Sequence, residues 1–141
     1  MTIPLFTLCQ ICYRPNISKY LVIINYIIYF LITIYLLFFK SIGISGINLH
    51  LLDYFIVDMR EHPAIVCFNL LFFLPLGFLF RPTCKHQVLF LIFIICTEGI
   101  QLILHLGFFD IGDILVNWIG FFLGNLLPNT SLGKYITQKI K

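Results

Sequence analysis

The stretch from Ile92 to Gly124 constrains the fold more than any other part of the chain, because it sets ionisable groups into two long apolar runs. It contains the carboxylic acids Glu98, Asp110 and Asp113. A charged side chain at the middle of a bilayer costs about 2.5–3.5 kcal/mol on insertion scales. Membrane helices therefore carry such groups mainly where a partner, a cavity or a function compensates for them. The stretch predicts a membrane-embedded helix pair with a polar site.

The composition of the whole chain also indicates a membrane protein. Of its 141 residues, 60% are hydrophobic and only 11% are charged, against about 25% charged residues in an average soluble domain. The net charge of +3 comes from scattered basic residues, so no nucleic-acid partner is predicted. These proportions predict an all-α protein with a single membrane domain.

Four apolar segments predict the helices of an integral membrane four-helix bundle, at residues 20–39, 64–80, 88–106 and 114–127. The first is long enough to cross about 30 Å of hydrocarbon. A signal peptide is the competing interpretation of it, but a signal sequence has an apolar run of only about 7–15 residues. The last segment is too short to cross alone, so its helix is expected to extend back toward Phe108.

The polar segments predict how the chain is divided and oriented. Residues 1–19 form a cytoplasmic or interfacial N-terminal segment, 20–127 the transmembrane domain, and 128–141 a basic cytoplasmic tail. With both termini cytoplasmic, the outer loops hold only the basic residues Lys40 and Arg60. The inner segments hold the other seven, as the positive-inside rule requires, namely Arg14, Lys19, Arg81, Lys85, Lys134, Lys139 and Lys141. Segment 41–63 is interpreted as an interfacial or a re-entrant piece.

Helical periodicity places the embedded polar residues on two stripes. At 100° per residue, Glu98, Gln101 and His105 fall within about 80° of one another. Asp113, Asn117, Gly120 and Gly124 fall within about 60° on the next helix. Because the acidic turn at 107–113 makes these helices antiparallel neighbours, the two stripes are expected to face each other. We predict a polar pocket that opens outward and is lined by Asn69, Glu98, Gln101, Asp110, Asp113 and Asn117.

Several of these residues also have a structural interpretation. Glu98 is either a functional group or a neutral carboxyl that is hydrogen-bonded to Gln101 or Asn117. Asp113 serves as the N-cap of the last helix, as a site residue, or as both. Four further residues are predicted to serve helix packing. Pro75 would kink its helix, and the glycines would permit close approach of neighbouring helices, namely Gly77, Gly120 and Gly124.

No metal site and no cofactor are predicted. Asp110, Asp113 and His105 do not by themselves define a metal geometry. The pair Cys9 and Cys12 has C-x-x-C spacing, but no second pair accompanies it, and the five cysteines of the chain imply no disulfide framework. No nucleotide-binding loop and no hydrolase motif occurs in the sequence.

The order and spacing of the polar and small residues resemble those of the VanZ-like membrane proteins. The resemblance spans residues 69–124 and includes Asn69, Pro75, Gly77, Glu98, Gln101, Asp110, Asp113, Asn117, Gly120 and Gly124. It implies a small multi-pass protein of the bacterial cytoplasmic (inner) membrane, and the founding member of the family is linked to resistance to the glycopeptide teicoplanin. Family members often carry an arginine shortly before the first aspartate. Here that segment reads LGFFD, and Arg60 is the candidate substitute.

Three kinds of function are compatible with this pattern. An envelope protein would use the pocket to bind a glycopeptide, a cell-wall precursor or a membrane lipid. An enzyme or carrier would act on a lipid-linked substrate, with Glu98 or an aspartate transferring a proton. A structural bundle would assist the assembly of a membrane partner. The pattern leaves the catalytic residues, if any, and the oligomeric state open.

Overall fold

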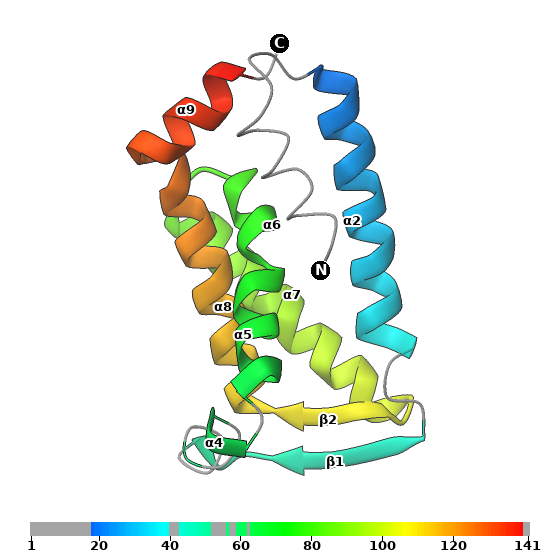
Figure 1. The fold of residues 1–141 in the computed structure, drawn as a ribbon. Coiled ribbons are helices and arrows are strands. Elements are labelled where there is room, and N and C mark those ends of the chain that lie inside the picture. The colour runs from blue at the N-terminus through cyan, green and yellow to red at the C-terminus, as the bar shows by residue number, and fades with distance from the viewer. Residues whose placement is uncertain (1–17, 40–42, 52–55, 57–58, 62, 140–141) are drawn as a thin grey trace.

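The computed structural model describes residues 18–39, 43–51, 56, 59–61 and 63–139. These residues are mostly helical, as predicted (Figure 1). The N-terminal segment 1–19 lies outside the described residues except for its last two positions. The pair Cys9 and Cys12 and most of the segment 52–58 lie outside them as well.

The helices follow the predicted apolar segments and differ from them at their ends. They are α2 (Lys19–Phe39), α4 (Met59–Glu61), α5 (Pro63–Phe72), α6 (Leu74–Phe78), α7 (Cys84–Ile103), α8 (Ile111–Leu126), the 3-10 turn η2 (Leu127–Asn129) and α9 (Ser131–Lys139). The tail after residue 127, predicted only as a polar segment, is therefore helical over most of its length.

Two short parallel strands close one end of the helices, and the sequence pattern did not predict them (Figure 1). β1 (Ile44–Asn48) pairs with β2 (Leu106–Asp110), so that Asn48 lies opposite Asp110. The prediction of a tight turn at 107–113 is therefore wrong, because the chain stays extended through Asp110. Backbone N–H and C=O groups close to hydrocarbon need partners, and the two extended segments supply them to each other.

The chain follows the path helix–strand–helix twice (Figure 1). α2 leads through β1 toward α5 and α6, and α7 leads through β2 to α8. Because the strands are parallel, α2 and α7 run toward the strands, and α5, α6 and α8 run away from them. α8 packs against α5, α6 and α7, whereas α2 packs against α7.

Three of the described helices are long and apolar enough to cross a membrane: residues 19–38, 84–103 and 111–129. The remaining predicted span is a shorter apolar stretch that is interrupted at Phe73, two residues before Pro75. Hydroxyl groups from α2 bind backbone carbonyls at the interruption. Tyr29 Oη donates to the carbonyl oxygen of Phe72 at 2.6 Å, and Tyr26 Oη donates to that of Pro75 at 3.2 Å. These bonds connect α2 to the interruption between α5 and α6.

The hydrophobic core consists of Phe73, Phe90, Ile94, Ile114 and Phe121. The rings of Phe90 and Phe121 stack with centroids 4.1 Å apart, and Phe73 meets Phe90 edge-on at 5.1 Å. The core therefore joins α7 and α8 to the interruption between α5 and α6. Along α7 the same face continues from Phe90 and Ile94 to Glu98 at intervals of four residues.

Candidate functional site

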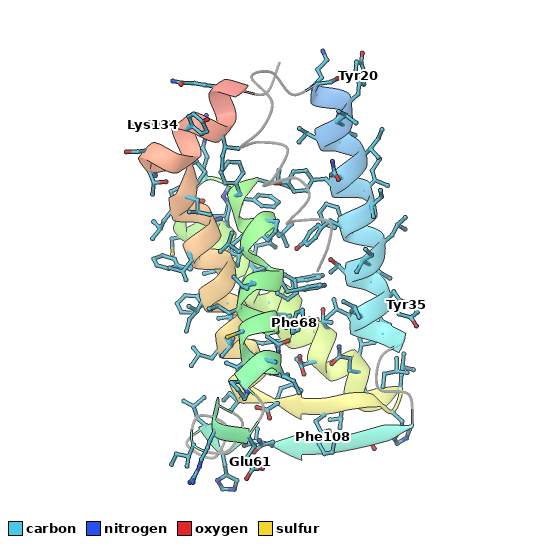
Figure 2. The ribbon with its side chains drawn as sticks, in the orientation of Figure 1. Tyr20, Tyr35, Glu61, Phe68, Phe108 and Lys134 are labelled. Atoms are coloured by element: carbon cyan, nitrogen blue, oxygen red, sulfur yellow. The ribbon has the colours of Figure 1, made fainter. Side chains whose placement is uncertain are left out.

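The predicted polar residues of three helices lie at a similar depth below the strands. Glu98 is five residues before the end of α7, and Asn69 and Asn117 are six residues after the starts of α5 and α8. At 1.5 Å per residue, all three lie about 8–9 Å from the strand-capped end. Figure 2 labels Phe108 and Glu61 at this end, and Tyr20 and Lys134 at the opposite end.

Glu98 is almost completely buried, with 4% of its surface exposed. Its carboxyl accepts a hydrogen bond from the backbone N–H of Asp110, the residue that ends β2. The Oε2 atom is buried and has no hydrogen-bond partner among the described residues. The charges of Asp113 and Asp110 both act on this carboxyl. The bond to β2 differs from the predicted structural partners, Gln101 and Asn117.

Asp110 joins the end of β2 to the start of α8. Its Oδ1 accepts from the backbone N–H of Gly112 at 2.7 Å, which makes Asp110 the N-cap of the helix. Its Oδ2 accepts from Nδ2 of Asn48, across the paired strands, at 2.8 Å. The structure therefore assigns the predicted N-cap role of Asp113 to Asp110, because α8 begins three residues earlier than its apolar run.

Asp113 lies in the first turn of α8 and connects that helix to α5. Its Oδ1 accepts a hydrogen bond from Nδ2 of Asn69 at 2.6 Å. Both side chains are half-buried. Asn117 follows one turn later on the same face of α8. It is 4% exposed, and its Oδ1 has no partner within the described part of the chain.

The other two members of the predicted α7 stripe bind elsewhere. Gln101 is buried and donates from Nε2 to the carbonyl oxygen of Leu37 on α2, at 2.8 Å. His105 lies beyond the helix end with a positive φ of 54°. It is exposed, and its Nδ1 is 2.8 Å from Oγ of Ser45 on β1. Of the predicted stripe, Glu98 and Gln101 therefore lie in the interior and His105 does not.

The predicted packing glycines lie in the contact of α8 with α5 and α6. A Cβ atom on Gly120 would overlap the carbonyl oxygen of Leu70, and one on Gly124 would overlap that of Leu74. A Cβ on Gly77 of α6 would overlap the carbonyl oxygen of Phe121. Gly120 and Gly124 of α8 therefore face α5 and α6, which run parallel to α8. The prediction that they face the polar stripe of α7 is wrong.

Two features of the structure were missing from the predicted site. Asn48 is one, because its strand was not predicted. The other is a polar contact at the far end of α8, where fully buried Asn125 accepts from Gln87 of α7 and donates to the carbonyl oxygen of Gly77. Asn125 falls eight residues after Asn117, a helical spacing that would have placed both side chains near one face.

The remaining candidates give no metal-binding group. Among the residues described, no three His, Cys, Asp or Glu side chains are placed to hold a metal ion together. Cys67, Cys84 and Cys96 are exposed free thiols. Arg60, the candidate substitute for the missing arginine, is exposed in α4.

The contact of Asn48 with Asp110 gives a first prediction, since it joins the two strands beside the site. Replacing Asn48 by alanine should lower the free energy of unfolding by about 1 kcal/mol, the usual net value of one intramolecular hydrogen bond. Asn48→Asp should lower it further, because it places two carboxylates opposite each other. Thermal unfolding in detergent measures both changes, and equal melting temperatures for the two variants would contradict the prediction.

The sequence was compared with models of protein families. Residues 26–131 match the family model described as VanZ/LLP1, a range that runs from the middle of α2 to the first residue of α9. It includes every residue of the predicted site. No curated protein and no solved structure matches the chain.

Proposed function

The chain belongs to the VanZ/LLP1 family, and from this membership we propose that it protects the bacterial cell envelope against the glycopeptide teicoplanin. In this proposal it is a multi-pass protein of the cytoplasmic membrane. Its buried polar residues beneath the strands bind the glycopeptide or a cell-wall precursor and so lower the access of the antibiotic to its target.

The distribution of basic residues supports an orientation with the strands outside the cell. The end opposite the strands carries Lys19, Arg81, Lys85 and Lys134, whereas the strand-capped end carries Arg60 among the described residues. Under the positive-inside rule, the basic end faces the cytoplasm. A reporter that is active only in the cytoplasm should therefore be active when it is fused to either terminus. Detection of a terminus on the outside of the cell would overturn the orientation.

The observation that carries the proposal is the environment of Glu98. A buried carboxyl with an oxygen that lacks a partner is costly in a membrane protein. It lies close enough to Asp113 and Asp110 for their charges to act on it. A purely structural carboxyl would be expected to have both oxygens bonded. Among the residues that the structure describes, Oε2 of Glu98 has no partner, so a ligand is the favoured explanation.

Teicoplanin susceptibility in a sensitive host tests the proposal. Wild-type protein should raise the inhibitory concentration, and Glu98→Gln and Asp113→Asn should each remove the increase at matched membrane levels. Glu61→Gln is the control, because it removes an exposed carboxylate in α4 and should leave protection unchanged. Full protection by both site variants would reject a role for the site and favour a structural bundle.

The same carboxyls favour a second candidate, an enzyme or carrier for a lipid-linked envelope substrate. Interacting carboxyls can hold and pass on a proton as a group, which suits a proton-transfer role for Glu98. Turnover or transport of a lipid-linked precursor by reconstituted protein, lost in Glu98→Gln, would support this candidate over a binding protein. Retention of protection without turnover would favour binding alone.

A further inference from the structure

The polar residues at the ends of the two strands and in the adjoining helices contain more hydrogen-bond acceptors than donors. We call them the acceptor cluster: Asn48, Asn69, Glu98, Asp110, Asp113 and Asn117. Ionised carboxylates only accept hydrogen bonds, and each of the three accepts at least one. Asp110 accepts from Asn48 and from the N–H of Gly112. Asp113 accepts from Asn69, and Glu98 accepts from the N–H of Asp110.

Two buried acceptors of the cluster have no partner among the described residues. They are Oε2 of Glu98 and Oδ1 of Asn117, and each of these side chains is 96% buried, being 4% exposed. Both residues lie at the same depth, on the adjacent helices α7 and α8. Buried polar atoms are almost always hydrogen-bonded in native proteins. The two atoms therefore indicate a ligand that brings hydrogen-bond donors.

The charge of the cluster indicates the sign of that ligand. The charges that act on Glu98 are those of Asp113 and Asp110, and both have the same sign as its own when it is ionised. Carboxylates held together in a medium of low dielectric repel one another strongly. A bound positive charge would relieve this repulsion, and a neutral or anionic ligand would not.

We propose that the acceptor cluster binds a primary ammonium group carried by an envelope lipid. This group combines a positive charge with three N–H donors, which matches both unpartnered oxygens and the excess of carboxylates. A metal ion is not proposed, because no three His, Cys, Asp or Glu side chains among the described residues are close enough together to bind one. The proposal rests on the proposed function only in using the same site.

The depth of the cluster agrees with a lipid headgroup as the source of the amine. α7 has 20 residues and is about 30 Å long, the thickness of the hydrocarbon core. The strand-capped end therefore lies at one membrane interface, where lipid headgroups lie. Asn69 and Asp113 are half-buried, so this pair forms the side of the cluster that a headgroup can reach.

Thermal unfolding of the purified protein with three short-chain lipids tests the proposal. Dihexanoyl phosphatidylethanolamine carries an ammonium group with N–H donors. Dihexanoyl phosphatidylcholine carries a cation without N–H donors, and dihexanoyl phosphatidylglycerol carries no cationic group. At about ten times its Kd, the ethanolamine lipid should raise Tm by about 4 °C. The other two should give at most a quarter of that shift. Ethylammonium chloride should stabilise the protein more than sodium chloride at equal concentration.

Variants locate the effect in the cluster. Glu98→Gln and Asn117→Leu should each abolish the difference between the lipids, and the second serves if the first does not fold. Glu61→Gln should keep the difference. Equal shifts with all three lipids, equal shifts with the two salts, or a difference retained in both cluster variants would overturn the proposal. If the protein binds the amine but does not change teicoplanin susceptibility, the proposed function is rejected and the lipid ligand is not. If it changes teicoplanin susceptibility but does not bind the amine, the lipid ligand is rejected and the proposed function is not.

Discussion

Gly120→Ala is expected to lower the free energy of unfolding by about 3 kcal/mol, at the upper end of the usual range for overpacking. The added Cβ would overlap the carbonyl oxygen of Leu70. This atom belongs to the backbone of α5, so the contact can be relieved only by moving one helix away from the other. Gly124 and Gly77 make similar backbone contacts between α8 and α6, and a displaced α8 would lose them too. Van der Waals packing is the main attraction between helices in a bilayer, which is why such a small change has a large effect.

Gly99→Ala is the matched control, because it makes the same substitution inside α7 where nothing lies within 4 Å of the added atom. Alanine favours a helix over glycine by about 1 kcal/mol, so this variant should be as stable as wild type or slightly more so. Thermal unfolding in one detergent, together with the yield of monodisperse protein, compares the two. Equal stability of Gly120→Ala and Gly99→Ala would contradict the described contact of α8 with α5.

The helices could be predicted from the sequence because the length of an apolar run is a local property. Apart from the interruption at Phe73 and the additional helix α9, the errors lay at the helix ends. α7 begins at Cys84, before the predicted Val88, because the Thr83 side chain accepts from the backbone N–H of His86 and caps the helix. α8 begins at Ile111 because Asp110 caps it. In both places a polar capping residue decides the boundary, and hydropathy is insensitive to it.

The strands could not be predicted in the same way. β1 has five residues, among them a glycine that is covered by the ring of Phe108 from β2. A segment this short has no clear period, and its pairing partner lies about sixty residues away in the chain. Strand formation here depends on helices that bring both segments to one end. The family resemblance did not supply this information either, since the quoted residues begin at Asn69, after β1.

The candidate site was partly predictable. Periodicity correctly placed Glu98, Gln101 and Asn117 on inward faces, since all three are buried. Their partners depend on tertiary structure. The structural interpretation of Glu98 expected a bond to Gln101 or Asn117, whereas Glu98 accepts from the backbone of β2 and Gln101 donates to the backbone of α2. The assumption that consecutive helices present their stripes to each other also failed for the glycines. They face α5 and α6, which lie parallel to α8 because both strands run in the same direction.

The second large effect is expected at the other end of α8. Asn125→Leu should lower the free energy of unfolding by about 2 kcal/mol. Asn125 is fully buried, donates from Nδ2 to the carbonyl oxygen of Gly77 at 2.7 Å, and accepts from Nε2 of Gln87. It therefore connects α8 to the end of α6 and to the start of α7. Without it, Nε2 of Gln87 loses its partner, while Oε1 of the same side chain is already buried and has no partner in the described part of the chain. Asn25→Leu is the control, because Asn25 donates to Leu21 of its own helix and should tolerate the change.

Adding Gln87→Leu to Asn125→Leu separates the cost of an unpaired amide from the value of the pair. Losing one partner leaves a desolvated polar group, whereas replacing both by apolar side chains removes that penalty. The double variant should thus be less destabilised than the sum of the two single variants, by about 1 kcal/mol in a double-mutant cycle. Additive losses would mean that the two amides stabilise the fold independently. In that case the bond from Asn125 to the carbonyl of Gly77 would account for most of the loss in Asn125→Leu.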